Sequence, residues 1–323
     1  MAWHMKNFPA IGLSINLTVL AAFLLFFHIS QCVASDIEPA DFNLTEISAG
    51  IFVHQGKHVD LEHPQHDDIA NIGFIVGQSC VAVIDTGGSI RVGTLLREAI
   101  RRLTSVPVCY VVNTHVHYDH ILGNIAFKSD QIKFIGHATL AEAMLANRLF
   151  FLDNYAQNLG PDASAESIIG PDIVVEKTMQ LDLGDRILTL TAHQTAHSHT
   201  DLSVYDQNSQ TLWLSDLLFV ERIPALEGSL KGWLALMDEL AAIKARLVVP
   251  GHGPVSGKWP ESNIHQQRYL NLLLQQTREM IAKGQFLEEA IESVANEEKQ
   301  TWQLYEQHHK RNVTKAFLQL EWE

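Results

Sequence analysis

Short apolar runs alternate with a helical pattern of apolar and charged positions in the first half of the chain. Residues 51–54, 71–77 and 80–84 are short and largely apolar, which is typical of buried β-strands. In residues 92–103 the apolar positions recur every three or four residues and arginines occupy the opposite face, which predicts an amphipathic helix. The apolar run 106–112 then predicts another strand. This order of strand, helix and strand predicts a βαβ unit with parallel strands.

The rest of the chain repeats this plan before it becomes wholly helical. Gly184-Asp185 separates two apolar runs and predicts a hairpin turn, whereas the Asn, Gly, Pro and Asp residues of 153–172 predict a loop. A last helix is predicted to end at Trp322. Apolar spacing predicts strands over 133–137, 179–183, 186–191, 202–205, 211–214 and 246–249, and helices over 138–152, 230–241, 264–281 and 286–294.

The strand at 106–112 is followed by three histidines and an aspartate within a few residues. His115 and His117 are two positions apart, so on an extended backbone their side chains leave on the same face and can hold one metal ion. Asp119 and His120 follow where the chain has to turn, and can hold a second ion. Imidazole nitrogens and carboxylate oxygens suit Zn²⁺ in catalytic sites. A surface cluster of histidines is the alternative. Three further ligand-type residues at strand ends argue against it: His197, Asp216 and His252.

The order and spacing of these residues resemble the metallo-β-lactamase superfamily. The resemblance rests on the His-x-His-x-Asp-His block at 115–120, the single His197, Asp216 at a strand end and the Pro-Gly-His-Gly turn at 250–253. It covers about residues 45–257. It implies an α/β fold, a four-layer αββα sandwich with a dinuclear zinc site between the two sheets.

The resemblance also implies a role for each of these residues. One zinc ion would be held by three histidines, His115, His117 and His197. The other would be held by one carboxylate and two further histidines, Asp119, His120 and His252. Asp216 would bridge the two ions, Asp119 is also the expected catalytic carboxylate, and Asp85 would orient ligands without binding metal. Because the set contains no thiolate, iron or manganese also stay open as the metal.

The chemistry that the resemblance implies is hydrolysis of a carbonyl compound. Zinc lowers the pKa of bound water from about 15.7 to about 7, which makes hydroxide available at neutral pH. A metal-bridging hydroxide would attack an ester, thioester, lactone or amide, and no Gly-x-Ser-x-Gly elbow in the sequence suggests a protein nucleophile. Three side chains are weaker candidates for substrate binding, with packing or plain solvated charge as the alternatives: Tyr118, Arg222 and Lys231.

Longer motifs resemble a narrower family, the quinoprotein relay system zinc metallohydrolases. They are the runs 85–89, 213–222 and 228–234 and the tail motif Arg311-Asn312-Val313-Thr314. Members of that family are exported and accompany alcohol dehydrogenases that depend on pyrroloquinoline quinone (PQQ). The resemblance therefore implies a companion role to a quinoprotein dehydrogenase, but it supplies no substrate.

Residues 1–35 have the composition of a signal peptide. Lys6 precedes a mostly apolar stretch over 11–27, and Val33-Ala34-Ser35 provides small residues before a cleavage site. We therefore expect a periplasmic hydrolase domain over 36–323, with a C-terminal helical extension from about 258. An uncleaved membrane anchor is the alternative, because the apolar stretch is nearly long enough to span a bilayer.

Charge and cysteine content add two points. The formal net charge of -14 argues against a nucleic-acid partner, and a small-molecule substrate is the expectation. Cys80 and Cys109 stand near the starts of two strands that would be neighbours. They therefore either form a disulfide or remain buried thiols.

Three other functions stay open at this point. A true β-lactamase is disfavoured by Asp216, where the broad-spectrum branch of the superfamily has cysteine, and by Phe219, where lysine would be expected. A glyoxalase II-like thioester hydrolase fits Asp216 but does not fit export. A non-catalytic zinc-binding accessory of a dehydrogenase would share the whole set of ligands.

Overall fold

The computed structural model of the chain describes residues 42–129 and 131–323. The predicted signal peptide, residues 1–35, lies outside the described residues. Within the described ranges, no helix combines the length and the apolar character that crossing a membrane requires.

The first sheet contains seven strands, which follow one another in space as they do in the chain. They are β1 (Leu44–Ser48), β2 (Ile51–His54), β3 (Ile72–Val76), β4 (Val81–Ile84), β5 (Val108–Val112), β6 (Lys133–His137) and β7 (Ile173–Val175). Strands β1 to β4 pair antiparallel, and β4 to β7 pair parallel. Helix α2 (Ile90–Leu103) connects β4 to β5, so the predicted βαβ unit is confirmed.

The second sheet contains five strands. They are β8 (Thr178–Asp182), β9 (Ile187–Ala192), β10 (Leu202–Asp206), β11 (Thr211–Phe219) and β12 (Leu247–His252), in the spatial order β12-β11-β10-β9-β8. Strands β8 to β11 pair antiparallel, and β11 pairs parallel to β12. The β8–β9 pairing confirms the hairpin predicted at Gly184-Asp185.

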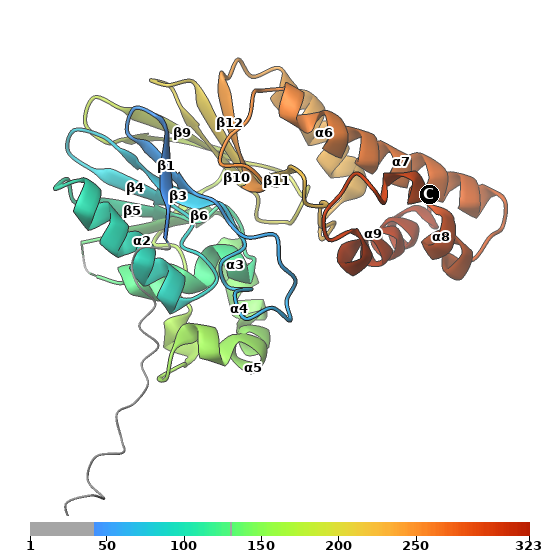
Figure 1. Cartoon of the computed structure of the whole chain (residues 1–323), viewed down its shortest axis with the longest axis horizontal. Helices are drawn as coiled ribbons and strands as arrows, with labels where there is room; N and C mark the ends of the chain where they lie inside the picture. The colour runs from blue at the N-terminus through green and yellow to red at the C-terminus, as the bar shows by residue number, and fades with distance from the viewer. Residues whose placement is uncertain (1–41, 130) are drawn as a thin grey trace, which may run out of the picture. The chain divides into compact units, whose positions relative to one another are not determined.

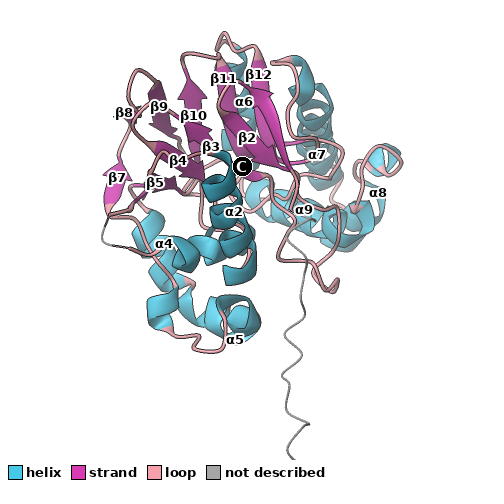
Figure 2. Ribbon diagram, turned by 60° about the vertical axis from the view of Figure 1, so that its left-hand side comes forward, coloured by secondary structure: helices cyan, strands magenta, loops and turns pink. Residues whose placement is uncertain are grey.

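The two sheets pack against each other through a shared apolar core. Ile84 and Val112 of the first sheet belong to the same buried cluster as Leu190 and Trp213 of the second. Figure 2 shows the strands of both sheets between two sets of helices. The inner faces of the two sheets therefore bury each other, and this apolar contact holds the sandwich together.

Helices cover the outer face of each sheet, which confirms the predicted αββα sandwich (Figure 1). On the first sheet, Val92 and Leu96 of α2 pack in one cluster with Phe74. On the second sheet, helices α6 (Leu230–Ala241) and α7 (Ile264–Ala282) contribute Trp233 and Leu270 to a cluster with buried residues of β11. The remaining helices are α3 (Tyr118–Ile121), α4 (Leu140–Ala146), α5 (Arg148–Leu159), α8 (Leu287–Ser293) and α9 (Tyr305–Leu320).

The last helix, α9, is fixed to the segment that joins β11 to α6. The side chain of Asn312 accepts a hydrogen bond from the backbone nitrogen of Leu226 at 2.9 Å and donates one to the carbonyl oxygen of Pro224 at 2.6 Å. The side chain of Gln319 likewise accepts from the backbone nitrogen of Leu230 at 2.9 Å and donates to the carbonyl oxygen of Gly228 at 2.8 Å. Residues from the end of the sequence thus set the conformation of this connection.

The structure differs from the sequence prediction in four places. The prediction of a loop over 153–172 is wrong at its start, because α5 continues to Leu159. Tyr155 and Leu159 of this helix are buried in a separate small apolar cluster. The pattern missed β1 and β7, which are the two edge strands of the first sheet and have mixed burial. Strand β11 passes through Asp216 and ends at Phe219, beyond its predicted end.

Cys80 and Cys109 are bonded as a disulfide, with their Cα atoms 5.7 Å apart. Cys80 stands directly before β4, and Cys109 lies in the neighbouring parallel strand β5. Of the two arrangements that the sequence left open, the structure has the paired one.

Candidate metal centre

The histidine block lies where β5 ends and the chain turns into α3. Residues 113–117 leave the strand, and His117 has extended backbone angles as the residue that precedes the first turn of α3. Asp119 and His120 lie within that single turn and are buried. The change from extended to helical backbone therefore sends the first two histidines and the last two ligand-type residues in different directions.

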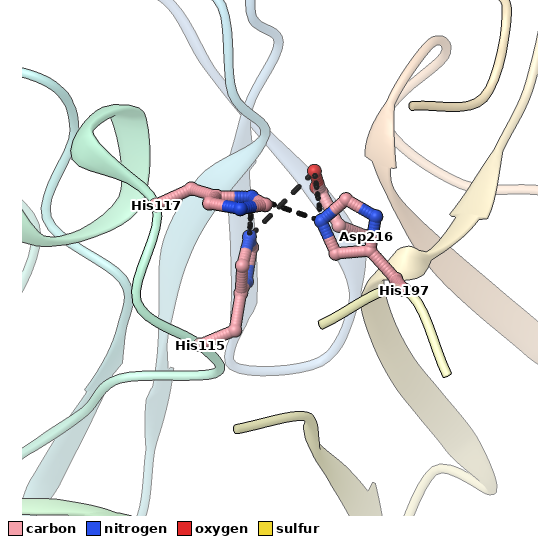
Figure 3. Close-up of side chains that lie close together, drawn as sticks. All are labelled: His115, His117, His197 and Asp216. Carbon is pink, nitrogen blue, oxygen red and sulfur yellow. Dashed lines mark hydrogen bonds and ion pairs between the residues drawn. The ribbon is translucent and has the colours of Figure 1, made fainter. Parts of the chain in front are cut away.

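Three imidazoles converge on one point (Figure 3). Nδ1 of His117 lies 3.0 Å from Nε2 of His115 and 2.9 Å from Nε2 of His197. Together with the carboxylate of Asp216, these nitrogens form a group whose members all lie within 4.8 Å of one another. His197 comes from the loop between β9 and β10, so both sheets contribute to this group.

A second group lies beside the first and consists of Asp119, His120 and His252. Oδ2 of Asp119 is 3.6 Å from Nε2 of His120 and 3.4 Å from Nε2 of His252. All seven sequence-predicted ligand positions are therefore brought together in two adjacent groups, and either group could hold a metal ion.

Asp216 contacts both groups. Its Oδ2 lies 3.4 Å from Nε2 of His197 and 3.3 Å from Nε2 of His252, and its Oδ1 lies 3.1 Å from Nε2 of His120. A carboxylate in this position can bind two cations at once, one through each oxygen.

Hydrogen bonds on the outer side of the rings turn the inner nitrogens toward the centre. Nδ1 of His197 donates to the carbonyl oxygen of Ala225 at 2.8 Å, and Nδ1 of His252 donates to the carbonyl oxygen of Ile69 at 2.8 Å. Because a carbonyl oxygen can only accept, these contacts place the proton on Nδ1 and leave the lone pair on Nε2. Both rings are thus set in the tautomer that binds a metal ion through Nε2.

Asp85 orients His120 and joins several elements. Its carboxylate, fully buried after β4, accepts hydrogen bonds from Nδ1 of His120 at 2.8 Å and from the Oγ of Ser215 at 3.2 Å. It also accepts from the backbone nitrogen and the hydroxyl of Thr114, at 2.8 and 2.7 Å. Asp85 lies outside both groups of potential ligands, as expected for a residue that orients a ligand.

Burial sets the charge of the first group. It lowers the pKa of His115 and His117, and it lowers the pKa of His197 to about 3. The three rings are therefore neutral at pH 7, which is the form of imidazole that binds a metal ion.

In the second group, nearby charges outweigh the effect of burial on the pKa values. Burial alone would lower the pKa of His120, but the carboxylates of Asp216, Asp119 and Asp85 outweigh it and raise that pKa well above its usual value. Burial alone would raise the pKa of Asp216, but the surrounding histidines, His252 and His120 first, hold it well below its usual value. The carboxylates of this site therefore favour a positive charge at its centre.

Two buried polar atoms at this centre, Nε2 of His120 and Oδ1 of Asp216, lie 3.1 Å apart without forming a regular hydrogen bond. In the described part of the chain, neither Nε2 of His120 nor Oδ1 of Asp216 makes a hydrogen bond of acceptable geometry. An unpaired buried acceptor or donor is costly, and a cation between the two groups would satisfy both atoms. The residues present therefore fit a metal ion chemically as well as by position.

Two residues beside these ligands have a strained backbone. Asp85 and Ser215 have left-handed backbone angles, with φ of 56° and 49°, which non-glycine residues rarely adopt. The β11–β12 register shifts on both sides of Ser215, and such a bulge re-aims the side chain that follows it, here Asp216.

A cavity of about 470 Å³ opens onto the two groups. Asp119 and Asp216 line its floor, and Phe150, Phe151 and Tyr155 of α5 supply an apolar wall. The lining also includes four polar residues from two parts of the chain, the β11–α6 connection and α9: Arg222, Glu227, His308 and Arg311.

The structure separates the three weaker substrate-binding candidates. Tyr118 lines the cavity, but its hydroxyl donates to the carbonyl oxygen of His66 at 3.2 Å and its ring stacks on Tyr155. Arg222 also lines the cavity. Lys231 is not among the lining residues, and its ammonium group pairs with Glu323.

Sequence reasoning missed the cavity residues that come from α5 and α9. His308 and Arg311 line the cavity although they follow β12 by many residues. Burial lowers the pKa of His308 to about 4, so its ring is neutral at pH 7. The available signal was the tail motif that begins at Arg311, which pointed to a family and not to a place in the fold.

An αββα sandwich with His and Asp side chains gathered at its strand ends is the architecture of a metal-dependent hydrolase. The chain belongs to the metallo-beta-lactamase superfamily, whose family model matches residues 67–252. This confirms the broader of the two resemblances found in the sequence.

Individual relatives add two enzyme names. A linear primary-alkylsulfatase from Pseudomonas sp. is 24% identical over 214 residues, which are 54% of this chain and 40% of that protein, so this chain spans less than half of that relative. Among solved structures, a metallo-beta-lactamase from Pontibacter korlensis has a TM-score of 0.58 and 21% identity, covering 71% of this chain and 98% of that one. The sec-alkylsulfatase Pisa1 from Pseudomonas sp. has a TM-score of 0.66 and 15% identity, covering 86% of this chain and 50% of that one. At these identities the two structures show a shared fold.

Gly251 should be indispensable to the position of Asp216. A Cβ atom there would overlap the Oδ1 of Asp216 and lie 2.7 Å from its backbone nitrogen. We expect Gly251→Ala to lower the free energy of unfolding by about 1–3 kcal/mol, measured by urea denaturation of the metal-free protein. Gly170→Ala is the control, since its Cβ would meet only the sulfur of Met144 at 3.8 Å. Equal stability of the two variants would contradict this assignment.

Proposed function

We propose that the chain is a dinuclear zinc hydrolase of a small ester, thioester, lactone or amide. The observation that carries this proposal is the position of Asp216, whose two oxygens face two adjacent groups of imidazole nitrogens at the floor of a cavity. His115, His117 and His197 would hold one ion, and Asp119, His120 and His252 would hold the other. Asp216 would bridge them, with Asp85 fixing the ring of His120.

When bound, the two ions supply Lewis acidity and a water whose pKa is lowered to about 7. The chain's own residues supply orientation and a place for the proton. Asp119 belongs to the second ligand group and lines the cavity, so its carboxylate can hold the proton released during attack and return it to the leaving group. The apolar wall of α5 excludes water from the other side of the substrate.

Hydrolysis of a sulfate ester is the second candidate. It is favoured by the similarity to two alkylsulfatases and by the two arginines that line the cavity, Arg222 and Arg311. In this case the bond broken would belong to a sulfate group instead of a carbonyl group, while the ligand residues would keep their roles.

The function is tested by metal analysis of the purified protein together with a substrate panel. The panel contains p-nitrophenyl esters, a glutathione thioester, aliphatic lactones, nitrocefin and octyl sulfate, so that each alternative has its own substrate. We expect turnover of a carbonyl ester or lactone that a chelator abolishes and zinc restores. His117→Ala should remove turnover and at least one equivalent of zinc while the circular dichroism spectrum stays unchanged. Stoichiometric zinc with no turnover of any substrate would favour a non-catalytic accessory.

We further propose that the protein is exported to the periplasm and acts beside a PQQ-dependent alcohol dehydrogenase. The support is the set of sequence motifs at 85–89, 213–222, 228–234 and 311–314 and the signal-peptide pattern of residues 1–35. In a host that carries such a dehydrogenase, replacing the chain by its His117→Ala variant should lower alcohol oxidation as much as deletion does. Unimpaired oxidation after deletion would refute the companion role.

Metal binding should release protons at neutral pH. Because the pKa of His120 is raised well above its usual value, its ring is protonated in the metal-free protein at pH 7.5 and must lose that proton to bind. We expect release of at least one proton when zinc fills the site, one from His120 and a further share from the metal-bound water, and tighter binding as pH rises. Calorimetric titrations in buffers of different ionisation enthalpy measure this quantity. Binding without proton release would show that His120 is not a ligand or is not charged.

A further inference from the structure

Arg222 carries a buried charge that the protein itself does not neutralise. The residue is 5% exposed and lines the cavity above the two ligand groups. Within residues 42–129 and 131–323, its Nη1 has no hydrogen-bond partner, and no carboxylate forms an ion pair with its guanidinium. The carboxylates of Asp119 and Asp216 are close enough to act on the charge of Arg222, but each of them is paired with a histidine.

The backbone on both sides of Arg222 is held firmly, so the side chain is not left unpaired by a loose loop. Glu221, the preceding residue, has a left-handed backbone with φ of 65°. Its carbonyl oxygen accepts from the backbone nitrogen of Gln303 at 2.8 Å, and the carbonyl oxygen of Gln303 accepts from the nitrogen of Ile223 at 3.1 Å. The segment between β11 and α6 is thus locked to the C-terminal part of the chain around the arginine.

A buried cation without a counter-ion is strongly unfavourable in the absence of a ligand. Burial lowers the pKa of Arg222, which reflects this cost. A guanidinium keeps its charge at any physiological pH, so an anion that enters the cavity is the group that can offset the cost. Arg311, the other arginine of the cavity, differs because its Nη2 lies 2.7 Å from Oε1 of Glu227.

Another part of the cavity lining suits an apolar group. Val116, Phe151 and Tyr155 are buried lining residues, and Phe150 lines the cavity while 52% exposed. The apolar wall therefore continues from the floor of the cavity to the molecular surface along α5. A chain or ring could lie along this wall and leave the cavity at Phe150.

We infer that the substrate is an anionic amphiphile, with a carboxylate or sulfate group bound by Arg222 and an apolar body lying on the α5 wall. This inference rests on the proposed function for the bond that is cleaved. It adds the recognition of the substrate: a bidentate hydrogen bond from the guanidinium fixes the anionic group, and the apolar body fills the remaining space.

The test measures binding of three probes that cannot be hydrolysed: octanoate, octane-1-sulfonate and the neutral octan-1-ol. Calorimetric titrations use the metal-loaded chain, and are repeated after chelation, with Arg222→Gln, Arg222→Lys and the control Arg278→Gln. Arg278 is an exposed arginine of α7 that pairs with Glu323 and is absent from the cavity lining. The comparison of octanoate with octane-1-sulfonate distinguishes a carboxylate from a sulfate-type group.

We expect Arg222→Gln to weaken binding of at least one anionic probe about tenfold or more, with or without metal, and to leave octan-1-ol unchanged. The affinity of Arg222→Lys for the anionic probe should lie between those of Arg222→Gln and the original chain. Arg278→Gln should bind the probes like the original chain. Without ligand, Arg222→Gln should unfold at the same or a higher temperature, because it removes an unpaired buried charge. A purely structural arginine would instead give a lower unfolding temperature.

Three results would overturn the inference: equal anion binding by Arg222→Gln and the original chain, equal loss of octan-1-ol binding, or anion binding that depends only on the metal. Failure of the proposed hydrolysis is a separate outcome. If Arg222-dependent anion binding is present and no ester of the panel is cleaved, the binding site stands and the proposed reaction fails.

Discussion

The rest of the site depends on the hydrogen bonds that the buried carboxylate of Asp85 accepts. This carboxylate lies after β4 and accepts hydrogen bonds from Thr114 beyond β5, from His120 in α3 and from Ser215 in β11. A fully buried carboxylate is tolerated only when donors satisfy it, so these segments cannot separate without a large cost. The strained backbones of Asp85 and Ser215 persist because this network fixes them from several sides. One unexposed charge thereby sets the distance between the two sheets at the point where the ligand groups meet.

The sandwich places residues that are distant in sequence at one edge of the molecule. Strand β11 runs parallel to β12, so Asp216 and His252 reach the same end of the second sheet, while His115 leaves the corresponding end of the first. The site therefore forms only when both sheets are packed, and the apolar core that contains Ile84 and Trp213 also holds the ligand groups in register. The contacts that stabilise the fold are therefore also the ones that position the ligand groups.

Much of this could be predicted from the sequence because the ligand-type residues occur in short, regularly placed motifs. The block at 115–120, Asp216 and His252 could be collected by the rule that strand ends meet at one edge, and their assignment to two ions followed from the resemblance to the superfamily. The cavity walls were not predictable, because α5 and α9 reach the site through long-range packing that leaves no local pattern. Arg222 and Lys231 look alike as sequence. They differ in the structure because Lys231 has a carboxylate partner and Arg222 has none among the described residues. The pairing of Cys80 and Cys109 likewise depended on strand adjacency that spacing alone left open.

The two hydrogen bonds of Asn312 extend the support of the site beyond the segment that defines the superfamily. They hold Pro224 and Leu226, and the carbonyl oxygen of the intervening Ala225 orients the ring of His197. The imidazole of His197 thus depends on a helix that begins at Tyr305, far outside the matched residues 67–252. A fragment that ends at residue 252 would lack Asn312, and the segment that orients the imidazole of His197 would lose the two hydrogen bonds that hold it. The helical tail is therefore part of the support of the metal centre in this protein.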